Sequence, residues 1–410
     1  MRNGLYLTKN SVVVFINYLM VLVAILFSKT MYFGVEKAST FQFVFYIVCI
    51  LGFLLCKGSI RTLKKNLLIV FGVGILLSIQ VFNISAFASD GFNTILGLFL
   101  KYFSCAFLAA SMNQKRFREC YINIMCFIAI TSFPFFIISI VSPGLAKSLA
   151  STSFHWTNAY EYSWFYTWGR GGNIIQRNGG PFWEAGAFQG FIILALLFLL
   201  YSVKNDDLDI WEFKPARNKF VLFCITILTT KSTTGYILLM AVVVFFYKDV
   251  IRILDVTKKK KKYVVLVAAL ISIAMIGYIV YSGNITNKLN NTYSDSAAIR
   301  GNDVVMSLFL IGRAGLVGLG PTVIKNSYES MFNMVNNSVG LLSMAYTYGM
   351  LFAVYLVVHF LKWLKRFFDA SGFQLFVYVL IFAVLHMTEG LWFLPVYMLT
   401  IMNNRKAESR

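Results

Sequence analysis

Apolar residues recur along most of this chain in runs long enough to cross a lipid bilayer. A helix of about 20 apolar residues spans a bilayer. The pattern therefore predicts an all-α polytopic membrane protein with about 12 transmembrane helices and a single integral membrane domain over residues 1–410. The expected spans are 11–28, 40–56, 67–82, 93–112, 119–142, 186–203, 219–230, 233–247, 263–282, 339–358, 373–386 and 391–402.

Polar residues interrupt two of the apolar stretches. Residues 219–247 and 373–402 are each longer than one span needs and short for two. The interruptions are Lys231–Gly235 and His386–Gly390. We expect each stretch to form two short or re-entrant helices, because broken backbone at membrane depth is tolerated where protein or a wet cavity surrounds it. Both breaks are therefore candidate walls of a site.

Two connections are long enough to carry function, residues 143–185 and residues 283–338. The second contains Val304–Ile311 and Leu316–Leu319, which are apolar enough to dip into the membrane or to pack on the helices. Aromatic residues are dense in the first, and they fit either a belt at the membrane interface or a surface that stacks on sugar rings. These residues are Trp156, Tyr160, Tyr162, Trp164, Phe165, Tyr166 and Trp168.

The composition excludes a soluble enzyme and a soluble domain on a single anchor. Hydrophobic residues make up 58% of the 410 residues and charged residues 13%, whereas soluble domains are about 45–50% apolar and about 25% charged. The six cysteines form neither a disulfide framework nor a CxxC metal pair. The first apolar run lacks a convincing small-residue cleavage site, so we expect it to be retained as a span.

The charge indicates which side of the membrane each segment faces. The chain has 37 Lys and Arg against 17 Asp and Glu, a net charge of +20. With a cytoplasmic N-terminus, 26 of the 37 basic residues fall in cytoplasmic segments and 10 in outer ones, which satisfies the positive-inside rule. We therefore expect both termini and the run Lys258–Lys262 in the cytoplasm, both long loops outside, and no nucleic-acid partner.

The segment Arg177–Gln189 has the most specific sequence, RNGGPFWEAGAFQ. Its glycines and proline predict a tight turn into the next helix, whose N-terminus would favour anions. One interpretation is an interfacial turn in which Arg177 and Glu184 pair with each other. The other is a site for an anionic, lipid-linked substrate with a carboxylate beside it.

This segment resembles the signature of bacterial O-antigen and capsule repeat-unit polymerases, the Wzy type of the O-antigen polymerase and ligase superfamily. The break Ser232–Tyr236 resembles the next element of that family. Arg300, Gly318–Gly320 and Asn336–Ser338 resemble a third, less specific element. The order of these elements and the two long loops match over most of the chain, whereas the N-terminal third matches only in hydropathy.

The resemblance implies a GT-C-like fold and a glycosyltransferase. Such enzymes polymerise undecaprenyl-diphosphate-linked oligosaccharide repeat units at the periplasmic face of the bacterial inner membrane, for lipopolysaccharide O-antigen, capsule or exopolysaccharide. The donor arrives activated as a lipid diphosphate, so no cofactor is expected. The expected partners are the lipid-linked oligosaccharide and membrane lipid, with a chain-length regulator and a flippase as further candidates.

A diphosphate leaving group needs fixed positive charge, and arginine pairs with phosphate through two hydrogen bonds. Four arginines lie in the expected outer loops, against the positive-inside bias, and are candidate substrate-binding residues. They are Arg170, Arg177, Arg300 and Arg313. The alternative is ordinary salt bridges within the loops, to Glu161, Asp295 or Asp303.

The acceptor hydroxyl needs a base or an orienting acceptor. Glu184 is the candidate catalytic residue because it lies in the most specific segment, although it could instead brace an arginine. His386 and Glu389 flank the last break at outer depth and are candidate substrate-binding residues, with a solvated turn as the alternative. His155 is a further candidate base, and its alternative role is that of an interfacial histidine.

No metal site is expected, because no expected outer segment has two acidic residues at DxD spacing. Two other functions stay open. Broken helices are common in transporters, so a transporter or flippase of the lipid-linked unit is an alternative, although the halves of the chain show no self-similarity. An O-antigen ligase is another, but the ligases carry a His-Asn pair where this chain has Asn336–Ser338.

Overall fold

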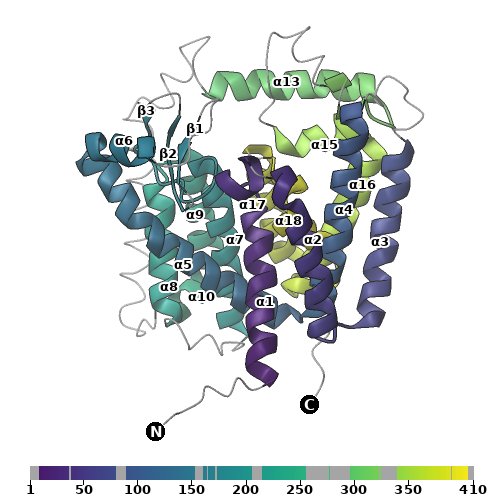
Figure 1. Ribbon diagram of the computed structural model, residues 1–410, viewed down its shortest axis with the longest axis horizontal. Coiled ribbons are helices and arrows are strands. Elements are labelled where there is room, and N and C mark those ends of the chain that lie inside the picture. Colours follow the sequence, from purple (N-terminus) through teal and green to yellow (C-terminus); the bar gives the residue numbers. More distant parts are fainter. Residues whose placement is uncertain are drawn as a thin grey trace.

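The computed structural model describes residues 9–36, 38–79, 89–152, 160–163, 165–170, 173–205, 215–254, 277, 296–321, 323–324, 339–388 and 390–404. Most of these residues are helical, and most of the helices run between an upper and a lower end (Figure 1). We call the end that carries the small β-sheet and α13 the upper end. The lower end is the one at which α1 begins and the described chain stops at Asn404.

The elements follow one another in this order. They are α1 (Lys9–Leu26), the π-helix η1 (Met31–Glu36), α2 (Ala38–Leu55), α3 (Ile60–Ser78), α4 (Ser89–Ser111), α5 (Gln114–Val141), α6 (Pro143–Thr152), β1 (Tyr160–Tyr162), β2 (Thr167–Arg170), β3 (Asn173–Ile174), α7 (Ala185–Lys204), α8 (Ala216–Thr229), α9 (Thr233–Phe245), α10 (Tyr247–Ile253), α13 (Ser296–Ala314), α15 (Gly340–Tyr348), α16 (Met350–Phe367), α17 (Gly372–Thr388), the 3-10 helix η5 (Leu391–Phe393), α18 (Pro395–Met398) and the 3-10 helix η6 (Leu399–Ile401).

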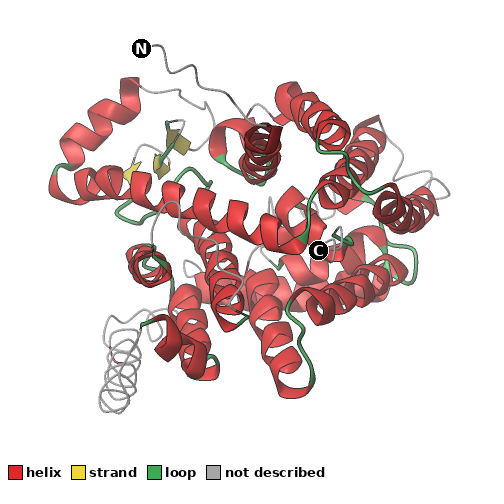
Figure 2. Ribbon diagram, turned by 90° about the horizontal axis from the view of Figure 1, so that it is seen from below, coloured by secondary structure: helices red, strands yellow, loops and turns green. Residues whose placement is uncertain are grey.

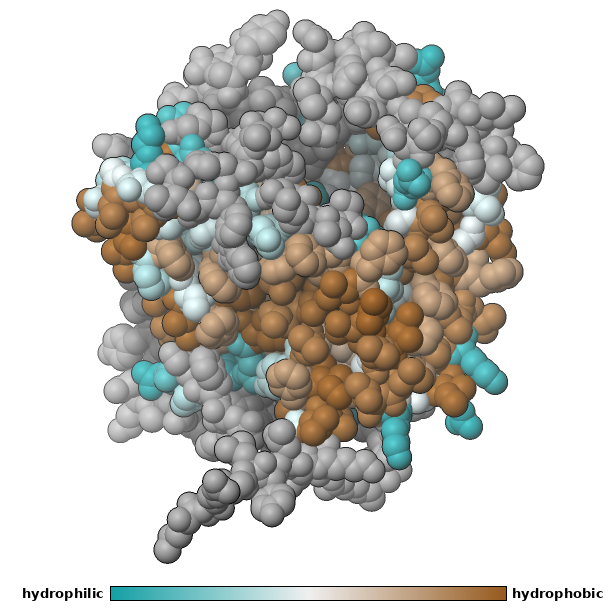
Figure 3. All heavy atoms as spheres, in the orientation of Figure 1, coloured by the Kyte–Doolittle hydropathy of each residue, from teal (hydrophilic) through white to brown (hydrophobic). Residues whose placement is uncertain are grey.

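Three described helices are long and apolar enough to cross a membrane, over Gly91–Ser111, Gln114–Val141 and Ala185–Lys204. Shorter apolar helices cover Ser11–Leu26, Phe41–Leu55, Thr233–Phe245 and Gly372–Met387. Apolar side chains dominate the middle of the face in Figure 3, and polar ones appear toward its upper and lower borders. The prediction of a helical, membrane-embedded protein is confirmed at this level.

Polar side chains begin two of the helices at the lower end. Ser59 precedes α3, and its hydroxyl accepts a hydrogen bond from the backbone N–H of Thr62 at 3.3 Å. Asn113 precedes α5, and its side chain accepts from the N–H of Arg116 at 2.8 Å. Each cap satisfies a backbone donor that the helix itself leaves unpaired. These caps define where α3 and α5 begin.

Helix α7 forms the centre of the structure. Its sequence is apolar on all sides, the pattern of a helix surrounded by protein, and nearly all of its side chains are buried. It packs against α5, α8, α9 and α10. Because α7 starts at Ala185, this packing fixes the position of the segment Arg177–Gln189, which leads into the helix.

The C-terminal stretch is broken where the sequence predicted. Helix α17 extends to Thr388, and η5, α18 and η6 follow as short turns. Protein atoms satisfy this irregular backbone: the N–H of Val396 donates to Ser28 Oγ at 3.0 Å, and Cys105 Sγ donates to the carbonyl of Pro395 at 3.5 Å. Seen from below, helices make up most of the described structure, and the strands of the small sheet lie to one side (Figure 2).

The other predicted break is also present. Helix α8 ends at Thr229 and α9 begins at Thr233. Lys231 between them has a φ of 49°, in the left-handed region, where the chain reverses direction. Both helices pack on α7, so the break lies at the upper end beside the start of α7.

One predicted span is wrong in detail. Residues 339–358 were expected to form a single helix, but α15 ends at Tyr348 and α16 begins at Met350. Gly349 between them has φ of 98°. The break is supported from outside, because the N–H groups of Leu319 and Gly320 donate to the carbonyls of Tyr346 and Thr347, each at 2.9 Å.

The first long loop is partly β-structure, which corrects the all-α prediction. Strands β1, β2 and β3 form an antiparallel sheet in that order, with Glu161 opposite Gly169 and Gly169 opposite Ile174. Aromatic and β-branched residues favour strands. A run of such residues between short turns therefore forms a hairpin-like sheet rather than an open loop.

Two of the aromatic residues in this loop, Tyr166 and Trp168, belong to a small core with residues of α5 and α6, and Tyr162 is also buried. Tyr162, Tyr166 and Trp168 are buried, and Phe135 of α5 stacks on Tyr166 with ring centroids 5.5 Å apart. For these three rings, the predictions of a belt at the membrane interface and of an exposed sugar-stacking surface are both wrong. Phe165 is exposed, and Trp156 and Trp164 lie outside the described residues.

The second long loop contains α13, which lies across the upper end above the other helices (Figure 1). Leu310 and Ala314 of α13 are buried with Ile324 and Tyr346. Of the two expectations for Val304–Ile311, packing on the helices is therefore confirmed for Leu310. The run Lys258–Lys262, His155 and Asn336–Ser338 lie outside the described residues.

Candidate functional site

The segment Arg177–Glu184 lies at the upper end, between the β-sheet and α7. Asn178 anchors it and is fully buried. The backbone N–H of Asn178 donates to the carbonyl of Thr229 at 3.0 Å. The side-chain Nδ2 of Asn178 donates to Ser132 Oγ at 3.0 Å and to Thr229 Oγ1 at 3.1 Å. The segment is thereby tied to α5 and to the end of α8.

The turn itself is held from two sides. Gly180 has φ of 52°, and its carbonyl accepts from the N–H of Thr167 in β2 at 2.8 Å. The carbonyl of Pro181 accepts from the N–H of Met31, just beyond α1, at 2.8 Å. Phe182 is buried and stacks on Phe191 with ring centroids 4.4 Å apart. These contacts fix the entry to α7, as the glycines and proline predicted.

Glu184 occupies the cap position of α7 and is exposed. Its side chain makes no capping hydrogen bond to the helix; instead, Trp183 Nε1 donates to Glu184 Oε1 at 2.8 Å. The interpretation in which Glu184 pairs with Arg177 is therefore wrong. The carboxylate is oriented by the indole and accessible at the upper surface.

Arg177 is also exposed, and its backbone and side chain are both held. Arg177 Nε donates to the carbonyl of Thr230, in the break between α8 and α9, at 2.9 Å. The carbonyl of Arg177 accepts from the hydroxyl of Tyr166 at 3.4 Å. Burial raises the pKa of Tyr166, although a hydrogen bond to Ser139 acts in the opposite direction, so this hydroxyl stays a proton donor.

The segment Arg177–Gln189 and the break Ser232–Tyr236, the first two elements of the sequence resemblance, meet here. Arg177 and Asn178 contact the end of α8, and Gln189, the last residue of the signature segment, packs on Gly235. A side-chain carbon on Gly235 would collide with Gln189 Oε1. The third element, Gly318–Gly320, contacts the ends of α15 and α16 instead.

Lys29 joins this site although sequence reasoning counted it only among the outer charges. Its Nζ lies 4.3 Å from the centroid of the Trp183 ring, a cation–π contact. Trp183 therefore contacts both a cation and the Glu184 carboxylate. The one sequence signal for Lys29 is its place against the positive-inside bias at the end of the first span.

The other candidate residues lie elsewhere or outside the described part. Arg313 is exposed near the end of α13, with its guanidinium 5.6 Å from the Phe309 ring. Arg170 ends β2 and Arg300 lies in α13, but the structure describes the side chain of neither. Glu389 also lies outside the described residues.

His386 is enclosed rather than solvated, so the solvated-turn interpretation is wrong for this residue. It lies within α17 and is fully buried. Its ring stacks on Trp392 with centroids 4.1 Å apart and lies 5.2 Å from the Tyr397 ring. Neither ring nitrogen has a hydrogen-bond partner among the described residues. A substrate would contact His386 only after this aromatic enclosure opened.

Within the described residues, no group of three or more His, Cys, Asp or Glu side chains is arranged to hold a metal ion. The site at the upper end offers an exposed carboxylate, an indole and Arg177 on one short segment, and Lys29 contacts the indole from the end of α1. Comparison with known proteins adds no family: no family model, curated protein or solved structure matches this chain.

Proposed function

We propose that this chain is a membrane glycosyltransferase that polymerises undecaprenyl-diphosphate-linked oligosaccharide repeat units at the upper end. The observation that carries the proposal is the placement of Trp183 between Glu184 and Lys29 at the start of α7. This arrangement puts a proton acceptor and a cation on the same aromatic ring. A reaction between a sugar hydroxyl and a sugar linked to diphosphate needs these groups.

Each group has a distinct role in the proposed reaction. The oxygen of the acceptor hydroxyl attacks the anomeric carbon of the donor, and the bond from that carbon to the lipid diphosphate breaks. The electron pair leaves with the diphosphate, and the hydroxyl proton passes to Glu184. Arg177 and Lys29 stabilise the charge that develops on the leaving diphosphate, and Trp183 keeps the carboxylate in position.

The remaining features of the proposal follow from the sequence. The upper end would face the periplasm, with both termini in the cytoplasm, because the basic residues are concentrated in the segments assigned to the lower end. The fold would be GT-C-like with about 12 spans, located in the bacterial inner membrane. Arg300 and Arg313 of the second long loop would add further phosphate contacts.

The two breaks by themselves would also suit a transporter. The C-terminal break is, however, packed by protein: Val396, Tyr397 and Met398 are buried, and Ser28 and Cys105 hydrogen-bond to its backbone. The exposed break, at Lys231, supports Arg177 instead. One break is therefore packed by protein and the other holds a residue of the proposed site, so neither requires a transport path. The transporter stays the second candidate.

A cellular test separates these functions. We expect cells that lack this chain to display glycan of a single repeat unit, because export and attachment continue without polymerisation. Loss of all surface glycan would instead indicate a transporter or a ligase. The control is the same strain complemented with the unaltered chain, which should restore the ladder of glycan lengths.

A further inference from the structure

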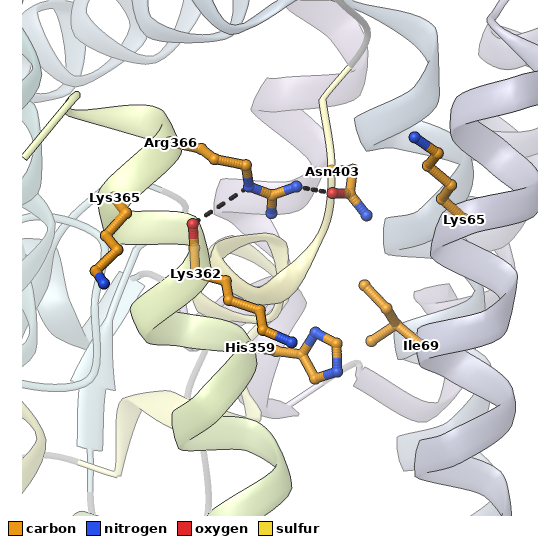
Figure 4. Close-up of a pocket in the computed structure, with 7 residues that line it drawn as sticks. All are labelled: Lys65, Ile69, His359, Lys362, Lys365, Arg366 and Asn403. Atoms are coloured by element: carbon orange, nitrogen blue, oxygen red, sulfur yellow. Dashed lines mark hydrogen bonds between the residues drawn. The ribbon is translucent and has the colours of Figure 1, made fainter.

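A second candidate site lies at the opposite, lower end of the molecule. It is a pocket of about 380 Å³ between α3, α16 and the segment after η6. Ligand-binding pockets commonly have volumes of roughly 300–1,000 Å³. The lining residues are Lys65, Ile69, His359, Lys362, Lys365, Arg366 and Asn403 (Figure 4).

The lining is basic. It includes three lysines, one arginine and one histidine, and no carboxylate among the residues that the structure describes there. His359, Lys362 and Arg366 recur at helical spacing on α16, so they lie near one another. Lys362 and Arg366 are four residues apart, and like charges at this spacing destabilise a helix. In Figure 4, Lys65 and Ile69 approach from α3, whereas Lys365 points to the other side of α16. A bound anion would offset the repulsion.

The arginine of this pocket is held by a chain of hydrogen bonds. Arg366 donates through Nε to the carbonyl of Lys362 at 3.2 Å and through a terminal nitrogen to Asn403 Oδ1. Asn403 is fixed in turn by Asn66, which is fully buried and accepts from the Asn403 N–H at 2.7 Å. Asn66 Nδ2 also donates to the carbonyl of Asn403 at 2.9 Å. The guanidinium is thereby preorganised, which favours anion binding.

The surface beside the pocket is apolar and exposed. On α3, Leu68 is 71% exposed and Phe71 65%. On α16, Val354 and Val358 are also exposed. These side chains lie on the same two helices, on the side of the pocket toward the middle of the molecule. A ligand with an anionic head and apolar chains would satisfy both surfaces.

We propose that this pocket binds the phosphate group of an anionic phospholipid, whose acyl chains lie along α3 and α16. Basic pockets between transmembrane helices at the cytoplasmic side bind such head groups, and arginine pairs with a phosphodiester through two hydrogen bonds. The lower end is the predicted cytoplasmic side. The proposal concerns a different end from the proposed catalytic site and does not depend on it.

Native mass spectrometry of the purified full-length chain tests this proposal. We expect phosphatidylglycerol to form adducts that survive delipidation, and phosphatidylcholine to bind at least about tenfold more weakly. The double variant Lys362→Gln/Arg366→Gln should lose this preference. Lys65→Gln, which leaves the Arg366–Asn403 contact intact, should reduce it. Lys64→Gln is the matched control, because Lys64 is an exposed neighbour that does not line the pocket, and it should bind as the unaltered chain does.

Three results would overturn the proposal. Equal retention of phosphatidylglycerol and phosphatidylcholine would show that the pocket does not select an anionic head group. Equal binding by the unaltered chain and by a Lys65→Gln variant that melts at the same temperature would place the lipid elsewhere. Inorganic phosphate that binds the pocket while the lipid does not would assign it to a soluble anion.

Discussion

The backbone of Gly318 crosses the backbone of Gly349 in direct contact. A side-chain carbon on Gly318 would lie 2.6 Å from the carbonyl oxygen of Thr347, and one on Gly349 would lie 2.5 Å from the carbonyl carbon of Val317. Both glycines have positive φ, 85° and 98°. The Gly-Leu-Gly sequence of the second long loop therefore has a structural role: it closes the break between α15 and α16.

This crossing predicts a large effect of a small substitution. Gly318→Ala and Gly349→Ala should each lower the free energy of unfolding by about 2–4 kcal/mol, because each adds a backbone clash in a conformation that side chains disfavour. Gly312→Ala is the control. Gly312 lies in α13 with open space around it, so alanine there should be neutral or stabilising. Thermal unfolding in detergent measures all three, and equal melting temperatures would refute the role of the crossing.

The sequence predicts breaks in helices only where polar residues mark them. Lys231–Gly235 and His386–Gly390 interrupt apolar stretches, and both breaks are present. The break at Gly349 has no such mark, because no charged residue and no run of strongly polar residues lies beside it. It depends on Gly318, which is remote in the chain and meets Gly349 only in the folded structure.

The same distinction applies to the candidate site. Arg177 and Glu184 are visible in the sequence because they lie in one unusual segment. Lys29 is not, because it reaches Trp183 across space from the end of α1. The burial of Tyr166 and Trp168 was also missed. Alternating aromatic residues look alike whether they face lipid, sugar or the side of α5, and only the packing of Phe135 decides between them.

The orientation in the membrane is predicted from charge and can be measured. Lys147 is exposed on α6 at the upper end, and Lys64 is exposed on α3 toward the lower end. The native cysteines lie buried or half-buried, so they should contribute little background. We expect Lys147→Cys to react with a membrane-impermeant thiol reagent in intact cells, and Lys64→Cys only after the inner membrane is opened. The reverse pattern would place the proposed site in the cytoplasm and refute the mechanism.

Loss of positive charge at Arg177 or Arg300 should slow the departure of the diphosphate leaving group. Arg177→Ala and Arg300→Ala should each lower the rate roughly 30- to 1000-fold, because one charged hydrogen bond to phosphate contributes about 2–4 kcal/mol. Arg177→Lys should recover only part of the rate, since lysine lacks the paired donors of arginine. Lys147→Ala, an exposed cation on α6, is the control. Normal glycan ladders from well-expressed alanine variants would reject this role.

Trp183 should act through Glu184. Trp183→Phe removes the Nε1 donor to Glu184 but keeps a ring for Lys29. We expect the rate of polymerisation to fall about tenfold, the effect of one hydrogen bond to a charged group. In a Glu184→Gln background the same change should have little further effect, because the group that Trp183 positions is then inactive. A double-mutant cycle measures this coupling, and additive effects would show that Trp183 acts independently.

The most direct test of the proposed function uses purified protein and purified lipid-linked repeat units. We predict that the unaltered chain converts them to a ladder of longer lipid-linked glycans and releases undecaprenyl diphosphate. Glu184→Gln keeps the size of the side chain and can still accept from Trp183, so at equal protein level and equal melting temperature it should lower the rate by about 10²- to 10⁴-fold, as loss of a general base does. No ladder from the unaltered chain would contradict the proposed polymerase, and a full ladder from Glu184→Gln would contradict the role of Glu184.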